Sequence, residues 1–109
     1  MEETRARLEP LGAAVSGFGH LGDGNLHLNV VTPDSFERRA EVTEAIEPFV
    51  YEWIAARRGS VSAEHGIGRM KPGVLHMSKS REMIELMRSL KALLDPHGIL
   101  NPQKVLPPA

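Results

Sequence analysis

Two histidines near the start of the chain flank a glycine-rich loop and are the residues best suited to bind a metal ion. His20 and His27 are separated by Asp23-Gly24, a dipeptide that strongly indicates a β-hairpin turn. If this dipeptide is the whole turn, the two histidines lie directly opposite each other, with Cβ atoms ~5 Å apart. Both imidazoles could then reach one divalent ion, although a longer loop would shift the register.

A divalent ion bound by two imidazoles needs at least one further protein ligand, and Glu64 is the obvious candidate. Two histidines and a carboxylate leave coordination positions open for substrate or water, as in catalytic metal sites. His65 follows directly, and neighbouring side chains point apart in an extended chain. We therefore expect Glu64 to hold the metal and His65 to accept a proton from the substrate. The alternative is a salt bridge from Glu64 to Arg69 or Lys71.

The spacing of the two histidines alone leaves a structural interpretation open, because histidines near a turn are more often exposed or hydrogen-bonded than metal-bound. The four glycines between residues 17 and 24 allow close approach of a ligand, but glycines in strands also mark bulges. Asn29 shares the predicted face with both histidines, together with Phe18. It could bind a substrate carboxylate or make a cross-strand hydrogen bond. His76 and His97 have no partner motif, and we expect both to be solvent-exposed.

The first half of the chain is expected to place a hairpin between two helices. A short polar helix over residues 2–10 should end at Pro10 and Gly12. After the hairpin, residues 33–35 open a second helix, which Pro48 should kink or divide and Gly59 should end. The predicted core stripe of this helix recurs at helical spacing and consists of Val42, Ile46, Phe49 and Trp53.

The second half is expected to form a loop and then a final helix. Residues 60–73 show little periodicity, and a helix from about Ser78 to Leu94 follows, with Ser78 or Ser80 as its cap. Its predicted apolar face comprises Met83, Leu86, Met87, Leu90, Leu93 and Leu94. The order helix, hairpin, helix, loop, helix predicts an α+β fold with an antiparallel sheet and helices packed on one face.

Composition excludes several classes of function. A chain of 109 residues is one domain or part of one, and it is too small to enclose both a flavin and a substrate. With a net charge of −1, the chain has no excess of positive charge that would attract nucleic acid or anionic lipid. The absence of cysteine excludes disulfides and thiolate chemistry. There is no apolar run of membrane-spanning length, and the acidic start does not fit a targeting peptide, so we expect a cytoplasmic or mitochondrial matrix location.

Three segments of the chain resemble the signatures of one enzyme family. Residues 19–29, 60–68 and 93–102 are similar, in this order, to the motifs of the C-terminal domain of FAD-linked oxidases in the vanillyl-alcohol oxidase superfamily. Residues 47–53 and 90–94 most resemble the D-2-hydroxyglutarate dehydrogenases of that family. The D-lactate dehydrogenases and the flavin subunit of glycolate oxidase share the core motifs. Together the segments cover most of the chain.

The resemblance implies oxidation of a small 2-hydroxy acid, with the α-hydrogen leaving as hydride to flavin N5 while a base takes the hydroxyl proton. It assigns the metal ligands His20, His27 and Glu64, the substrate contacts Asn29 and His65, and a flavin contact at Asn101. The metal in this family is usually zinc, and it would polarise the substrate hydroxyl while His65 accepts the proton.

The resemblance also implies that residues 1–109 are part of a metal- and substrate-binding domain whose flavin-binding domain lies upstream. No glycine loop precedes a helix in a way that would cradle the phosphates of FAD, so this chain alone is expected to be inactive. Surface meant for the upstream domain would be exposed, which predicts a homo-oligomer of the isolated chain. The electron acceptor is not indicated.

Two functions of other classes compete with this interpretation. One is a free-standing metal-binding or subunit-interaction domain that docks on a separate flavin chain and has no catalytic role. The other is a small metallohydrolase that activates water at the same three ligands. Hydrolysis by the isolated chain would favour the metallohydrolase, and a longer upstream reading frame would favour the flavin enzyme.

Overall fold

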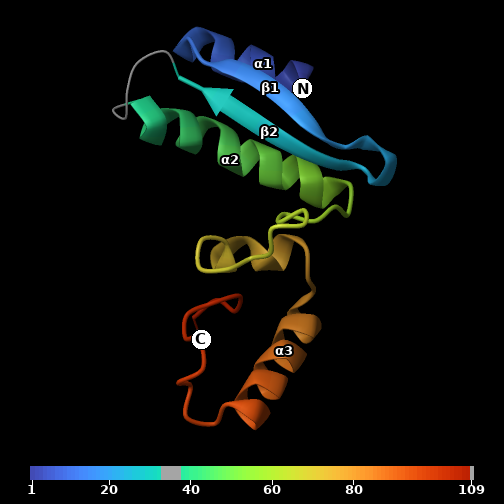
Figure 1. The fold of residues 1–109 in the computed structure, drawn as a ribbon, viewed down its shortest axis with the longest axis vertical. Coiled ribbons are helices and arrows are strands. Elements are labelled where there is room, and N and C mark those ends of the chain that lie inside the picture. Colours follow the sequence, from blue (N-terminus) through green and yellow to red (C-terminus); the bar gives the residue numbers. More distant parts are fainter. Residues whose placement is uncertain (33–37, 109) are drawn as a thin grey trace. The chain divides into compact units, whose positions relative to one another are not determined.

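The structure, a computed structural model, describes residues 1–32 and 38–108, and it divides into two compact units, Met1–Trp53 and Ile54–Ala109. Its helices and strands are α1 (Glu2–Leu8), β1 (Ala14–His20), β2 (Asn25–Val31), α2 (Arg39–Ala56) and α3 (Arg81–Leu94) (Figure 1). The predicted α+β class is confirmed. The predicted start of the second helix at residues 33–35 lies outside the described residues.

The β-hairpin of the first unit has a longer loop than the Asp-Gly dipeptide predicts. Residues Leu21–Asp23 form a 3₁₀ turn, and Gly24 follows in the left-handed region with φ 75°. The Asp23 carboxylate accepts the backbone N–H of Asn25 at 3.3 Å, which stabilises this wider turn. His20 therefore pairs with Asn25, and the predicted pairing of His20 with His27 is wrong by two residues. A shift of two preserves which face each side chain occupies.

One face of the hairpin packs on both helices of the first unit. Leu8 of α1 and Val42 and Ile46 of α2 are buried, and Val15 and Val30, paired across the strands, pack against them. Figure 1 shows α2 running along this hairpin. The predicted stripe of α2 is thus partly confirmed, with Phe49 half-buried and Trp53 42% exposed. The helix continues through Pro48 as one element, so the predicted alternative of a second start there is wrong.

Glycines end the first helical stretch and α2 as predicted, but in two different ways. Gly12 follows the 3₁₀ turn Glu9–Leu11 in the left-handed region, with φ 68°. After α2 it is Arg58 that takes the left-handed conformation, with φ 55°, and Gly59 donates its N–H to the Ile54 carbonyl at 2.9 Å. A Cβ at position 59 would lie 2.7 Å from Cγ2 of Ile54, so glycine is required there for close approach.

Replacing Gly19 with alanine is expected to destabilise the first unit by about 1–3 kcal/mol. Gly19 has φ 150°, and an added Cβ would lie 2.2 Å from the backbone oxygen of Asn25 across the hairpin. The backbone must move to relieve that contact. Gly22→Ala is the matched control, because no atom lies within 4 Å of a Cβ there. Urea unfolding of both variants measures the difference, and equal stabilities would contradict the prediction.

The second unit is organised around buried residues of its loop and 3₁₀ segment. Val61 and Leu75 are 4% and 2% exposed, and Leu75 lies in the 3₁₀ helix Pro72–Met77. The final helix begins later than Ser78. Ser80 is its cap, and the Ser80 hydroxyl accepts the N–H of Met83 at 3.3 Å. The alternative cap, Ser78, instead bonds the backbone of Gly59 and Val61 through its hydroxyl.

The predicted apolar face of α3 is not a core face within the described residues. Ile84, outside the predicted stripe, is the buried residue of this helix, at 9% exposure. The stripe residues that are exposed are Met83, Leu86, Leu90, Leu93 and Leu94. The amphipathic pattern therefore predicts the helix correctly, but most of its apolar face is exposed among the described residues. An exposed apolar stripe of this kind is typical of a surface that meets a partner.

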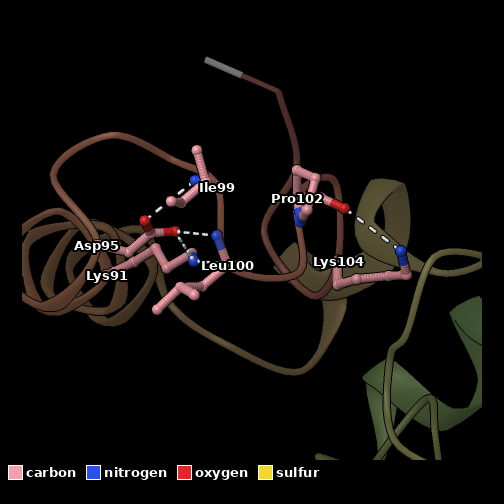
Figure 2. A network of polar contacts seen from close by, with 6 residues as sticks. All are labelled: Lys91, Asp95, Ile99, Leu100, Pro102 and Lys104. Atoms are coloured by element: carbon pink, nitrogen blue, oxygen red, sulfur yellow. Dashed lines mark hydrogen bonds and ion pairs between the residues drawn. The ribbon is translucent and has the colours of Figure 1, made fainter.

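Asp95 organises the segment that follows α3. Its carboxylate is almost fully buried and accepts the ammonium of Lys91 and the backbone N–H groups of Ile99 and Leu100, the last two at 3.0 and 2.9 Å (Figure 2). The hydrogen bond from Lys91, followed by those from the backbone, lowers the pKa of Asp95 below its ordinary value. The segment that leads to Asn101 is thus held by the Asp95 carboxylate and by the Lys91 ammonium, which also donates to the Leu100 carbonyl at 2.6 Å.

Asp95→Asn is expected to lose stability relative to the native chain at neutral pH, and this difference should shrink in acid. Because the pKa of Asp95 is lower in the folded state, its contribution is fully present above ~3.9, the ordinary pKa of the unfolded side chain. The contribution is lost as the pH falls through the folded-state pKa. Urea unfolding between pH 7 and pH 2.5 measures this, with Glu85→Gln on exposed α3 surface as the control. A constant difference across that range would contradict the prediction.

Candidate functional site

The histidines of the hairpin lie on the face opposite the core. Since Val15 and Val30 face the helices, the alternating positions Phe18, His20 and His27 project from the other side. The rings of Phe18 and His27 stack with centroids 5.3 Å apart and planes 9° apart. Asn29 is exposed on the same face, opposite Ser16. The predicted shared face is confirmed, although its register is not.

The corrected register makes the two histidines diagonal neighbours. His20 is opposite Asn25, and His27 is two residues along the same strand from Asn25. Diagonal residues on one face are ~7–8 Å apart at the backbone, which long side chains can bridge. His20 is exposed and His27 is half-buried, so both remain accessible from the same side. Both imidazoles therefore lie on one face, but direct cross-strand pairing does not bring them together.

Asn25, which the sequence did not single out, lies between these histidines on their face. Its side-chain oxygen is buried and has no hydrogen-bond partner among the described residues. A histidine that binds a metal through one ring nitrogen usually donates its other ring N–H to an acceptor of this kind. The unpartnered amide oxygen therefore fits a histidine metal site. The predicted two-residue turn concealed this role, because it pairs Asn25 with Gly22 instead of His20.

Glu64 and His65 lie on a turn of the second unit and not on extended chain. His65 donates its backbone N–H to the Ser62 carbonyl at 2.9 Å, and Ala63 adopts a left-handed φ of 47°. His65 Nε2 lies 4.0 Å from Glu64 Oε1, and the two side chains are 60% and 51% exposed. The expectation that these side chains point apart is therefore wrong. Their proximity lets both act on one substrate or ion.

The other predicted residues of the second unit lie as follows. Asn101 is exposed with a left-handed φ of 49°. It lines an open groove of about 370 Å³ together with Met87, Leu90, Lys91, Leu100, Lys104, Val105 and Leu106. His76 and His97 are exposed, as predicted. Lys71, one of the alternative partners considered for Glu64, donates to the Val61 carbonyl at 3.0 Å.

Comparison with known proteins assigns the class to which this fold and these motifs belong. Residues 1–105 match the family described as FAD linked oxidases, C-terminal domain. The chain therefore belongs to this family. No helix of the described residues has both the length and the apolar character needed to cross a membrane.

Proteins similar to this chain include some named D-2-hydroxyglutarate dehydrogenase and one named D-2-hydroxyglutarate–pyruvate transhydrogenase. The chain is 60% identical over 105 residues to the mitochondrial D-2-hydroxyglutarate dehydrogenase of Bos taurus, covering 96% of this chain and 19% of that protein. It is 54% identical over 107 residues to the enzyme of the same name from Arabidopsis thaliana, covering 98% and 18%. It is 49% identical over 90 residues to the D-2-hydroxyglutarate–pyruvate transhydrogenase of Saccharomyces cerevisiae, covering 83% and 18%. The chain thus spans about a fifth of the length of these relatives.

Proposed function

We propose that this chain forms the metal- and substrate-binding part of a flavin-dependent D-2-hydroxyglutarate dehydrogenase that produces 2-oxoglutarate. The observation that carries the proposal is the 60% identity to such an enzyme, which extends over nearly the whole chain and includes the motifs with His20, His27, Glu64 and His65. FAD would be bound mainly by the upstream part of the polypeptide, which is the main partner of this chain. The exposed apolar stripe of α3 is suited to contact that part.

The metal site of this proposal consists of His20, His27 and Glu64, and the ion is zinc. Two nitrogen donors and one carboxylate leave a position open for the substrate, which is the pattern of catalytic zinc sites. The buried oxygen of Asn25 would accept the second ring N–H of one of these histidines and so fix its orientation. The bound ion would polarise the hydroxyl of the 2-hydroxy acid.

His65 is the proposed base, and Asn29 the proposed partner of a substrate carboxylate. His65 would take the hydroxyl proton as the α-hydrogen leaves toward the flavin. Asn29 is exposed on the histidine face, where its amide can donate a hydrogen bond to the carboxylate. Asn101 would approach the flavin. The mitochondrial names of the relatives favour a matrix location in a eukaryote, with the cytoplasm as the alternative.

Anaerobic mixing of the whole flavin-containing protein with candidate 2-hydroxy acids tests this function. D-2-Hydroxyglutarate is expected to bleach the flavin absorbance at lower concentration than D-lactate or glycolate, and L-2-hydroxyglutarate is the stereochemical control. Preferential bleaching by D-lactate or glycolate would reassign the substrate within the family. No bleaching by any of them would leave the non-catalytic interaction domain as the better interpretation.

A further inference from the structure

Val61, three residues before Glu64, has both of its backbone polar groups bound by side chains from farther along the chain. Its N–H donates to the Ser78 hydroxyl at 2.9 Å, and its carbonyl accepts the ammonium of Lys71 at 3.0 Å. The Ser78 hydroxyl also donates to the Gly59 carbonyl at 3.2 Å. Val61 itself is 4% exposed. Residues 59–61 are thus fixed by two side chains that neither the motifs nor the family assignment singled out.

The residues that follow this anchor form an exposed turn, in which His65 donates its backbone N–H to the Ser62 carbonyl at 2.9 Å. Ala63 holds a left-handed φ of 47°, which costs about 1–3 kcal/mol for a residue with a side chain unless its surroundings enforce it. The Ala63 N–H makes a long hydrogen bond of 3.4 Å to the Ser60 carbonyl, and Glu64 and His65 are exposed. A surface turn of this kind opens easily when its ends are released. The turn that carries the two functional side chains is therefore joined directly to the anchor at Val61.

We propose that Ser78 and Lys71 are positioning residues for Glu64 and His65. The inference rests on the proposed function, in which these two side chains bind the metal and the substrate. Catalytic groups displaced by about 1 Å can lose ~100-fold in rate, so an anchor three residues away can control both metal affinity and turnover. Neither Ser78 nor Lys71 needs to touch the substrate to have this effect.

The test uses Ser78→Ala and Lys71→Met in the whole flavin-containing protein, with Ser78→Thr as the conservative variant that retains a hydroxyl. Ser89→Ala is the matched control. It also removes a serine hydroxyl that donates to a backbone carbonyl, that of Glu85 at 3.0 Å, but this serine lies on the exposed surface of α3. Zinc affinity is measured by chelator competition. The kinetic constants kcat and KM are measured with D-2-hydroxyglutarate, and opening of the loop is measured by hydrogen exchange over residues 60–66. We expect each of the variants Ser78→Ala and Lys71→Met to weaken zinc binding ~10-fold and to lower kcat ~10-fold. This is the lower end of the range of effects for residues that orient metal ligands.

The outcomes separate the inference from the proposed function. Faster hydrogen exchange at residues 60–66 in Ser78→Ala, with zinc affinity and kcat equal to those of Ser89→Ala, would overturn the inference and leave the function intact. Failure of the native protein itself to bind zinc would overturn the metal site of the proposed function, and the inference with it, whereas failure of D-2-hydroxyglutarate to bleach the flavin would overturn the proposed activity. If Ser78→Ala is too unstable to purify, Lys71→Met tests the same anchor from the carbonyl side. Recovery of affinity in Ser78→Thr supports the role of the hydroxyl.

Discussion

Replacing His27 with alanine is expected to weaken zinc binding by at least about a hundredfold. Loss of residues that merely orient metal ligands costs 10–100-fold in affinity, so loss of a ligand should cost no less. His27 is half-buried on the outer face of the hairpin with its ring stacked on Phe18, and β2 carries no second histidine that could replace it. Zinc content after dialysis and chelator competition measure the effect.

The control for this variant is His97→Ala, which removes an exposed histidine that has no predicted role. It should retain the zinc content of the native protein. Equal zinc in His27→Ala and His97→Ala would show that the ligand assignment is wrong. His20→Ala should behave like His27→Ala, since the two histidines are diagonal neighbours on one face.

Replacing His65 with glutamine is expected to lower kcat by ~10²–10⁴-fold while zinc remains bound, because this is the usual contribution of a positioned proton acceptor. Glutamine keeps much of the size and polarity of the side chain but cannot accept the proton in the transition state. The measurement is the rate of flavin reduction by D-2-hydroxyglutarate at saturating concentration, together with zinc content.

Glu64→Gln provides the complementary experiment. His65 Nε2 and Glu64 Oε1 are 4.0 Å apart, so geometry alone does not decide which of them serves the metal. The proposed division of roles predicts zinc loss in Glu64→Gln and zinc retention in His65→Gln. The opposite pattern would exchange the roles, and loss of zinc in both would make His65 a ligand as well.

The hairpin shows why part of the site could be predicted from the sequence despite an error in its geometry. Side chains alternate with a period of two, so the shared face of His20, His27 and Asn29 survives a register shift of two residues. The error arose because Asp23 stabilises a wider turn by accepting the N–H of Asn25. The hydrophobic pattern of the sequence does not reveal that hydrogen bond, because a polar side chain makes it. The role of Asn25 was missed for the same reason.

The second unit shows what the sequence pattern does not contain. The apolar stripe of α3 predicts a helix with one apolar face, but burial depends on a partner surface, and Leu93 and Leu94 are each 76% exposed. The lack of periodicity predicts a loop around Glu64, and the expectation that the Glu64 and His65 side chains point apart assumes extended backbone there. Its turn requires a left-handed Ala63, which residue type alone does not indicate. The anchors Ser78 and Lys71 act over 17 and 10 residues of sequence, beyond the reach of a local pattern.

The assignment of His20, His27 and Glu64 to one cation is tested most directly by anomalous X-ray diffraction at the zinc absorption edge. Crystals of the zinc-loaded protein should show one strong anomalous peak with a nitrogen of each histidine and an oxygen of the carboxylate ~2.0–2.2 Å away. A peak bound by other residues, or a well-ordered map in which these three side chains share no ion, would contradict the assignment.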